Sequence, residues 1–316
     1  MTYFWGERAV YAWSLDSRGL RAARIGSSDS VSVLVDFLRA SLESAGETDW
    51  TVPARRMWTT LLAPLDVADA RELLIVPDGV LAHLPFEVLI PLGDTLPIGA
   101  TRTISYGPSA SVLLALTRRA SDTAWPRTLL AVGNPEGASL PFAEREARAA
   151  YELFRADGAD LLVGRRASLD RWLSLTPGRY RYLHIAAHAE VNDRYPAQTR
   201  VLLSGGTLDL ARIRSLELRA DLVTLSACES ALGLRVRGEG VIGLPHAFLS
   251  AGASAVLVTL WRVDDRATAL FMEEFYREMH GGAPPAAALQ AVRHRWMTRL
   301  PRAHPAFWAP FVLVGA

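Results

Sequence analysis

The sequence has 316 residues, a length that fits one large or two medium-sized domains. Half of the residues are hydrophobic, which is enough for a substantial core, and the formal net charge of +1 gives no electrostatic reason to expect a nucleic acid or an anionic membrane as a partner. The single cysteine excludes an intramolecular disulfide framework and a metal site built from several cysteines, and it favours a reducing, cytoplasmic setting.

The first 120 residues predict a small α/β unit. The N-terminus lacks the charged region and long apolar stretch of a signal peptide, and no apolar run approaches the roughly 20 residues of a membrane span. Alternating runs around a DSRG turn predict a hairpin over 11–26, and the spacing of apolar residues predicts a helix over 30–46. A buried strand, a Pro-Asp-Gly turn and a proline-punctuated apolar segment follow over 70–91. We therefore predict an N-terminal unit, regulatory or resembling an inactive protease, over 1–120 and a second domain over 121–316.

From residue 128 onward, apolar strand patterns alternate with amphipathic helix patterns. The predicted strands cover 128–135, 160–164, 180–189, 199–206, 221–228, 253–263 and 306–316. The predicted helices cover 142–157, 168–177, 209–218, 241–252, 265–282 and 284–300. This alternation is typical of an α/β fold in which a mostly parallel sheet is flanked by helices on both faces.

Two predicted strands end in residues that are suited to nucleophilic catalysis. One is the strand "LHIAAHA", which has His188 near its end, and the other is the strand "LVTLSAC", which ends in Cys228. Ligands of open parallel sheets bind at the carboxyl ends of the strands, and neighbouring strands lie about 4.8 Å apart. If these two strands are neighbours, the imidazole of His188 can take the thiol proton of Cys228, and the resulting thiolate is the competent nucleophile.

Other interpretations of these residues remain open. A free cysteine is more often a small buried hydrophobic residue than a nucleophile. His184 and His188 are four residues apart, about 13 Å within a strand, so one metal ion cannot bridge them, and His184 is expected to be a core histidine. Four other histidines lack a comparable setting and are expected to be structural or surface residues: His246, His280, His294 and His304.

Two further motifs have competing explanations. Asp264 and Asp265 end the strand "VLVTLWRV", either as the N-cap and first-turn acid of a helix or as an acidic pocket lining. The segment 238–243, "GEGVIG", matches the G-x-G-x-x-G pattern of dinucleotide sites, but a real site requires that turn to follow its strand at once. Nucleotide-binding oxidoreductase chemistry is therefore the weaker alternative.

Seven ordered blocks resemble the CHAT domain, a bacterial family of the caspase–separase clan of cysteine peptidases. The blocks are "VPDGVLAHLPFEVL", "AVGNP", "LHIAAHA", "LLSGGTLDLARI", "LVTLSACESALG", "GEGVIGLPHAFLSAGASAVLVTLWRVDDRATALFMEEFY" and "HPAFWAPFVLVG". They extend from about residue 70 to the C-terminus. The resemblance implies a caspase-like α/β fold and a cysteine endopeptidase in which His188 and Cys228 form the catalytic dyad, with no metal or organic cofactor.

The same resemblance assigns further site residues. The backbone N–H groups of Ala189 and Cys228 would form the oxyanion hole. The substrate's P1 side chain would be held by Asp264 and Asp265, with Trp261 and Glu229 nearby, which implies a preference for Arg or Lys. The implied partners are a protein substrate and a separate activator, with no nucleic acid or membrane, and bacterial defence or cell death is the implied context.

This sequence departs from the family pattern at two places. Ala189 stands where glycine is usual after the histidine, and Ser230 and Ala231 replace the usual Thr-Gly after the cysteine block. Glycine permits close approach and unusual backbone angles, which alanine restricts. These departures support an alternative, a catalytically weak or inactive pseudo-peptidase that acts as a protein-binding scaffold.

Overall fold

The structure, a computed structural model, describes residues 1–43, 49–119, 125–136, 140–192, 195–226, 233–236, 240–298 and 304–315. Its strands are β1 (Thr2–Trp5), β2 (Ala9–Asp16), β3 (Gly19–Ser27), β4 (Glu72–Ile75), β5 (Thr103–Tyr106), β6 (Arg127–Pro135), β7 (Ala159–Gly164), β8 (Tyr180–Ala186), β9 (Ala189–Glu190), β10 (Arg200–Leu203), β11 (Gly206–Asp209), β12 (Leu222–Leu225), β13 (Gly233–Val236), β14 (Gly240–Gly243), β15 (Ala255–Thr259) and β16 (Phe311–Gly315). Its α-helices are α1 (Ser28–Glu43), α2 (Thr51–Leu61), α3 (Ala110–Arg119), α4 (Pro141–Phe154), α5 (Leu169–Ser174), α6 (Leu210–Arg214), α7 (Leu244–Ser250), α8 (Asp265–His280) and α9 (Pro285–Thr298).

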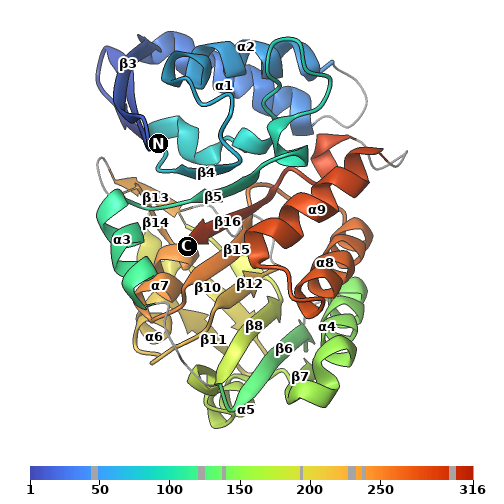
Figure 1. Ribbon diagram of the computed structural model, residues 1–316. Coiled ribbons are helices and arrows are strands. Elements are labelled where there is room, and N and C mark those ends of the chain that lie inside the picture. Colours follow the sequence, from blue (N-terminus) through green and yellow to red (C-terminus); the bar gives the residue numbers. More distant parts are fainter. Residues whose placement is uncertain are drawn as a thin grey trace.

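An eight-stranded sheet forms the centre of the molecule, in the order β4-β5-β16-β15-β12-β8-β6-β7 (Figure 1). The strands from β15 to β7 are parallel to one another, and β4, β5 and β16 form a second parallel group. The two groups meet at the antiparallel pair β15–β16. The central strands β12 and β15 are buried along their whole length, as expected when helices cover both faces.

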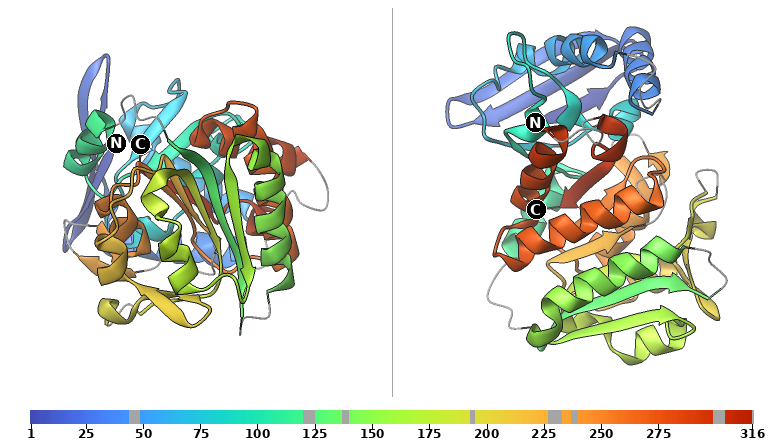
Figure 2. Two further views of the ribbon diagram at one scale, coloured as in Figure 1. Left: turned by 90° about the horizontal axis from the view of Figure 1, so that it is seen from below. Right: turned by 90° about the vertical axis from the view of Figure 1, so that its right-hand side faces the viewer.

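The helices cover the two faces of this sheet (Figure 2). The helices α4, α8 and α9 share one face, and α8 buries Phe271, Phe275 and Tyr276 at helical spacing. Asp264 caps the start of α8 by accepting a hydrogen bond of 2.9 Å from the Ala267 amide. Within the described residues, none of the helices combines the length and apolar character that a membrane crossing requires.

The N-terminal part of the chain forms the predicted hairpin and helix, and it also contributes two strands to the eight-stranded sheet. The strands β1, β2 and β3 form an antiparallel sheet, and the Tyr3 amide of β1 donates to Val76 just beyond β4, at 2.9 Å. The strands β4 and β5 belong to the eight-stranded sheet. The predicted boundary between residues 120 and 121 therefore lies between two strands, β5 and β6, of one sheet.

Two predicted elements, a strand and a helix, differ from the structure. The single strand predicted over 199–206 is a hairpin, in which β10 pairs with β11 on one side and β9 on the other. The helix predicted over 241–252 begins only at Leu244, where Pro245 occupies a position that favours helix starts. The β-branched pair Val241 and Ile242 instead lies in β14, which pairs with β13.

Candidate active site

The predicted neighbours β8 and β12 are adjacent parallel strands. Thr224 lies opposite His184, and Leu225 lies opposite Ile185. The Ser226 amide then donates to the Ile185 carbonyl at 3.0 Å, which is the last hydrogen bond between the two strands among the described residues. Of the strand predicted over 221–228, the described residues form β12 as far as Leu225, and residues 227–228 lie outside the described part of the chain. Cys228 and Glu229 lie outside the described residues.

A pocket of about 400 Å³ opens at the carboxyl ends of these strands. Its wall combines residues that follow three strands of the sheet with the starts of α4 and α8, as expected for a site in an open parallel sheet. The polar and strand-end residues of this wall include Ala187, His188, Ser226, Arg262, Asp264 and Asp265. The sequence-predicted His188, Asp264 and Asp265 are thus brought together in one pocket.

The backbone around His188 is held by the small sheet of β9, β10 and β11. The His188 carbonyl accepts a hydrogen bond of 2.8 Å from the Leu202 amide, and Ala189 lies opposite Val201. Ala189 is not among the described non-glycine residues that have a positive φ. Its backbone therefore does not require glycine, so alanine introduces no left-handed strain at the position where the family pattern has glycine.

The two aspartates of the pocket have different hydrogen-bond partners. Asp264 uses Oδ1 to cap α8, and Asp265 uses Oδ2 to accept from the Phe142 amide at the start of α4, at 3.3 Å. Burial raises the pKa of Asp265, the Phe142 amide opposes this rise, the Asp264 charge adds to it, and the nearby His188 lowers it. The two interpretations from the sequence are therefore compatible, because Asp264 caps a helix and also lies on the pocket wall.

Trp261 does not lie on the pocket wall with the aspartates. The side chain is buried, with 6% of the residue exposed, and its indole Nε1 donates to the Ala306 carbonyl at 3.3 Å. The contact fixes the segment that leads into β16 against the end of β15. Trp261 thus supports the scaffold behind the pocket, where the sequence suggested a substrate contact.

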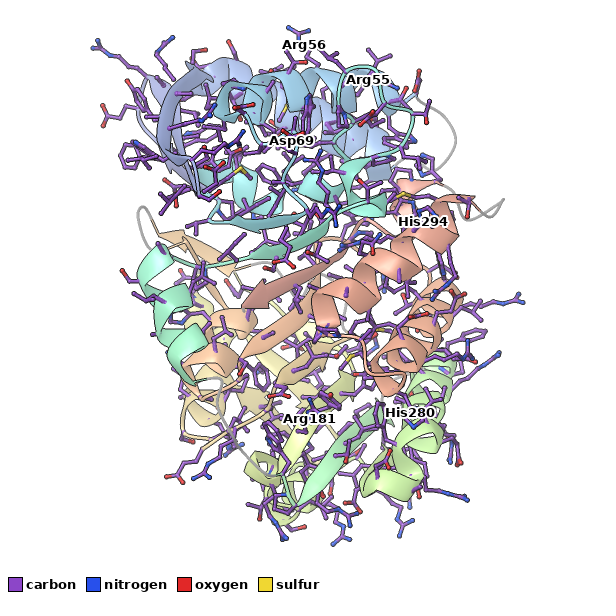
Figure 3. The ribbon with its side chains drawn as sticks, in the orientation of Figure 1. Arg55, Arg56, Asp69, Arg181, His280 and His294 are labelled. Atoms are coloured by element: carbon purple, nitrogen blue, oxygen red, sulfur yellow. The ribbon has the colours of Figure 1, made fainter. Side chains whose placement is uncertain are left out.

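His184 is fully buried, as the sequence predicts. Its Nδ1 lies 3.0 Å from the Tyr276 hydroxyl, and burial lowers its pKa to about 3. His280 lies at the far end of α8 from Asp265, about 22 Å away along a helix of this length, and its Nε2 is 3.6 Å from Asp157 Oδ2 (Figure 3). Neither histidine competes with His188 for the role of a base in the pocket.

Two polar residues near the pocket were missed by the sequence analysis. Ser226 lies on the pocket wall, and Glu146 of α4 lies behind it, with only 2% of the residue exposed. Burial raises the pKa of Glu146 to about 8, partly opposed by a hydrogen bond from the Ser226 side chain. The signal for Glu146 was present, because it shares the apolar stripe of α4 with Ala143, Ala147 and Ala150.

The other chemical hypotheses find less support in the described geometry. Gly240 and Gly243 of the G-x-G-x-x-G match lie in β14, an antiparallel hairpin strand, whereas a dinucleotide site needs them in the turn between a parallel strand and a helix. Gly238 lies outside the described residues. In the described parts of the chain, no cluster of three or more His, Cys, Asp or Glu side chains is arranged to hold a metal ion.

Comparison with curated proteins finds similarity to a long mammalian protein. The chain is 26% identical to tetratricopeptide repeat protein 28 of Mus musculus and 25% identical to that of Homo sapiens. Each alignment covers 84% of this chain, and the chain spans about 13% of the length of these relatives.

Comparison with solved structures identifies similar folds. The separase–securin complex of Saccharomyces cerevisiae matches 77% of this chain and 15% of that chain, with a TM-score of 0.54 and 17% identity. The complex of the RgpB pro- and mature domains of Porphyromonas gingivalis matches 91% of this chain and 76% of that chain, with a TM-score of 0.50 and 9% identity. These likenesses confirm the predicted caspase-like α/β fold.

The family comparison covers most of the sequence. The family model of the CHAT domain matches residues 51–316, which include the whole eight-stranded sheet and every residue of the candidate site. The match also confirms the resemblance that the seven sequence blocks predict. The chain belongs to the CHAT domain family, and its fold is related to that of cysteine peptidases.

Proposed function

We propose that the protein is a cysteine endopeptidase whose dyad is His188 and Cys228. His188 takes the thiol proton, and the thiolate of Cys228 attacks the scissile carbonyl carbon to form a tetrahedral intermediate. The leaving amine departs with a proton from His188, which leaves a thioester acyl-enzyme. Water, deprotonated by His188, then hydrolyses the thioester and regenerates the thiol. The backbone N–H groups of Ala189 and Cys228 are the proposed donors to the oxyanion.

The observation that carries this proposal is the register of β8 and β12. Ile185 lies opposite Leu225, so His188 and Cys228 each follow the last registered pair by three residues. Adjacent parallel strands deliver the chain to the same edge of the sheet, and the pocket that contains His188 and Ser226 lies at that edge. The peptidase-related fold supports the same assignment.

The acidic pocket wall supports a preference for Arg or Lys at P1. The pocket is lined by two acidic residues, Asp264 and Asp265, and by one arginine, Arg262. A net negative wall favours a cationic substrate side chain, and partial burial strengthens such pairing. Each carboxyl group accepts one backbone hydrogen bond, but burial raises the pKa of Asp265 and so disfavours its charged form. We therefore propose Asp264 as the main contact.

The expected partners are proteins. The neighbouring separase structure is a complex with securin, and this precedent supports a separate protein regulator for this chain. The resemblance to the CHAT family supports a role in bacterial defence or cell death and a cytoplasmic location. The alternative, an inactive scaffold, rests on the replacements at Ala189, Ser230 and Ala231. The backbone at Ala189 does not have a positive φ, so the replacement of glycine there gives this alternative little support.

The test is mass-spectrometric mapping of new protein termini in a host lysate with wild type and the variant Cys228→Ala. We expect new termini, formed after Arg or Lys, that require Cys228. Cleavage that persists unchanged in Cys228→Ala would refute the dyad. Capture of the same partner by both proteins without any cleavage would support the scaffold.

A further inference from the structure

A row of polar side chains lies behind the pocket wall in the interior of the molecule. Glu146 of α4, His184 of β8, Thr224 of β12 and Tyr276 of α8 are each between 0% and 2% exposed, and Ser226 connects the row to the pocket. Burying polar groups is costly unless each finds a hydrogen-bond partner. The hydrogen bonds among these side chains therefore decide how much their burial destabilises the protein.

The contacts are continuous from one end of the row to the other. The Tyr276 hydroxyl lies 2.8 Å from Thr224 Oγ1 and 3.0 Å from His184 Nδ1. On the other side of the imidazole, His184 Nε2 lies 3.3 Å from Glu146 Oε1. The Ser226 side chain hydrogen-bonds to the Glu146 carboxyl group. Glu146 thus connects the residue that follows β12 to the middle of β8.

The contact between Glu146 and His184 requires a proton. Glu146 Oε1 and His184 Nε2 lie 3.3 Å apart, and among the described residues neither atom has a hydrogen bond to any other group. Both atoms are buried, so if neither carried a proton their lone pairs would face each other. Burial raises the pKa of the carboxyl group to about 8 and lowers the pKa of the imidazole to about 3. At neutral pH the imidazole is therefore uncharged and has one N–H, and the carboxyl group is protonated. Because the Tyr276 hydroxyl donates to Thr224, Nδ1–H of His184 donates to the Tyr276 oxygen, and Nε2 is left to accept from the carboxylic acid. The Ser226 hydroxyl donates to the same carboxyl group.

The groups that face Glu146 come from three directions. His184 approaches from β8, Ser226 approaches from the end of β12, and Tyr276 and Asp265 approach from α8. The negative charge of Asp265 adds to the rise in the pKa of Glu146. The surroundings therefore favour the neutral carboxylic acid over the carboxylate.

We propose that Glu146, as a carboxylic acid, is a positioning residue for the dyad, because it ties Ser226 to His184. Ser226 precedes Cys228 by two residues, and His184 precedes His188 by four residues on the adjacent strand. The two contacts of one carboxyl group therefore fix the two chain segments relative to each other just before the dyad residues. This inference rests on the proposed function.

The single cysteine of the chain allows a direct test that needs no substrate. The rate of alkylation by iodoacetamide is measured by intact mass as a function of pH for wild type, Glu146→Gln, Glu146→Ala and the control Glu144→Gln. Glutamine keeps the shape of the acid, donates to Nε2 through its amide and accepts from Ser226 through its oxygen. Glu144 lies on the same helix, where its carboxylate pairs with Arg148 at the surface, so it controls for the substitution itself.

A thiol paired with His188 titrates well below the ordinary value of about 8.5, so the wild-type rate should reach its plateau at lower pH. We expect Glu146→Ala to lower the rate at neutral pH at least tenfold and to restore an ordinary thiol titration. We expect Glu146→Gln to recover the rate to within about threefold, and Glu144→Gln to keep the wild-type profile.

Two outcomes would overturn the proposal. If the alkylation profiles of wild type and Glu146→Ala give the same lowered thiol pKa, Glu146 does not position the dyad, although the proposed function stands. If Glu146→Gln is as impaired as Glu146→Ala while both remain folded by circular dichroism, the carboxylate and not the acid is required. An ordinary thiol titration in wild type would instead contradict the proposed function itself, and the positioning role with it.

Discussion

Replacement of Glu146 by glutamine should change how the stability of the protein depends on pH. The pKa of Glu146 is raised from 4.5 to about 8 in the folded protein, so between these values the unfolded chain releases a proton that the folded chain retains. The stabilisation is complete below pH 4.5 and is lost as the pH rises through 8. Glutamine does not ionise, so the variant lacks this dependence.

His184 contributes a dependence of the opposite sign. Its pKa is lowered from 6.5 to about 3, so as the pH falls below 6.5 the unfolded chain binds a proton that the folded chain excludes. The two effects cancel between pH 4.5 and 6.5, and only Glu146 acts between 6.5 and 8. A slope of about 1.4 kcal/mol per pH unit then predicts that wild type loses about 2 kcal/mol of unfolding free energy across this upper interval.

The measurement is equilibrium unfolding in urea, followed by tryptophan fluorescence at a series of pH values from 6.5 to 8. The nine tryptophans give a strong signal, and subtracting the wild-type free energy from that of Glu146→Gln removes every other group that titrates. The difference should grow by about 2 kcal/mol as the pH rises. A difference that stays constant within about 0.5 kcal/mol would mean that Glu146 is already ionised at pH 6.5, which would refute the protonated contact with His184.

Three further predictions concern the pocket and the core. His188→Ala should lower the alkylation rate of the single thiol at neutral pH at least tenfold, because the thiolate loses its cationic partner; an unchanged intact-mass time course would contradict this. Asp264→Asn should reduce kcat/KM for peptides with Arg at P1 at least tenfold, and it should leave the melting temperature unchanged because asparagine caps helices as well as aspartate does. Asp265→Asn should reduce kcat/KM less than Asp264→Asn does. If Asp265→Asn reduced it more, Asp265 and not Asp264 would be the main contact for the P1 side chain. Arg293→Met should cost about 3–5 kcal/mol in urea unfolding, because it leaves Glu87 buried without its partner at 3.0 Å, and adding Glu87→Gln should restore part of the loss.

Local patterns in the sequence predicted much of the fold. The alternation of strands and helices after residue 128 depends on hydrophobic periodicity, which a single sequence displays directly. The reversal at β16 and the entry of β4 and β5 into the same sheet were not predictable in this way. They depend on pairing between segments far apart in the chain, such as β5 with β16, and such partners are not encoded in local spacing.

In the candidate site, too, the residues that a local pattern marks were predicted, and the contacts between distant segments were not. His188 and the two aspartates were found because each follows a recognisable strand, and strand ends meet at one edge of the sheet. Trp261 follows the same strand as the aspartates, but its indole is directed to Ala306, a contact 45 residues away that the sequence does not reveal. The stripe of α4 predicts that Glu146 is buried, but its partners are His184 of β8 and Ser226 just after β12, and the pattern of its own helix does not reveal them.

The antiparallel meeting of β15 and β16 has a consequence for how the molecule would respond to a cut in its chain. The strands β4 and β5 reach the centre of the sheet through β16, and the fully buried pair Glu87 and Arg293 joins the N-terminal part to α9. After a proteolytic cut between β5 and β6, the two fragments would still be held together by the backbone hydrogen bonds of the sheet and by a shared hydrophobic core. We therefore expect the N-terminal part to remain bound to the rest of the protein after such a cut, and not to be released as a propeptide would be.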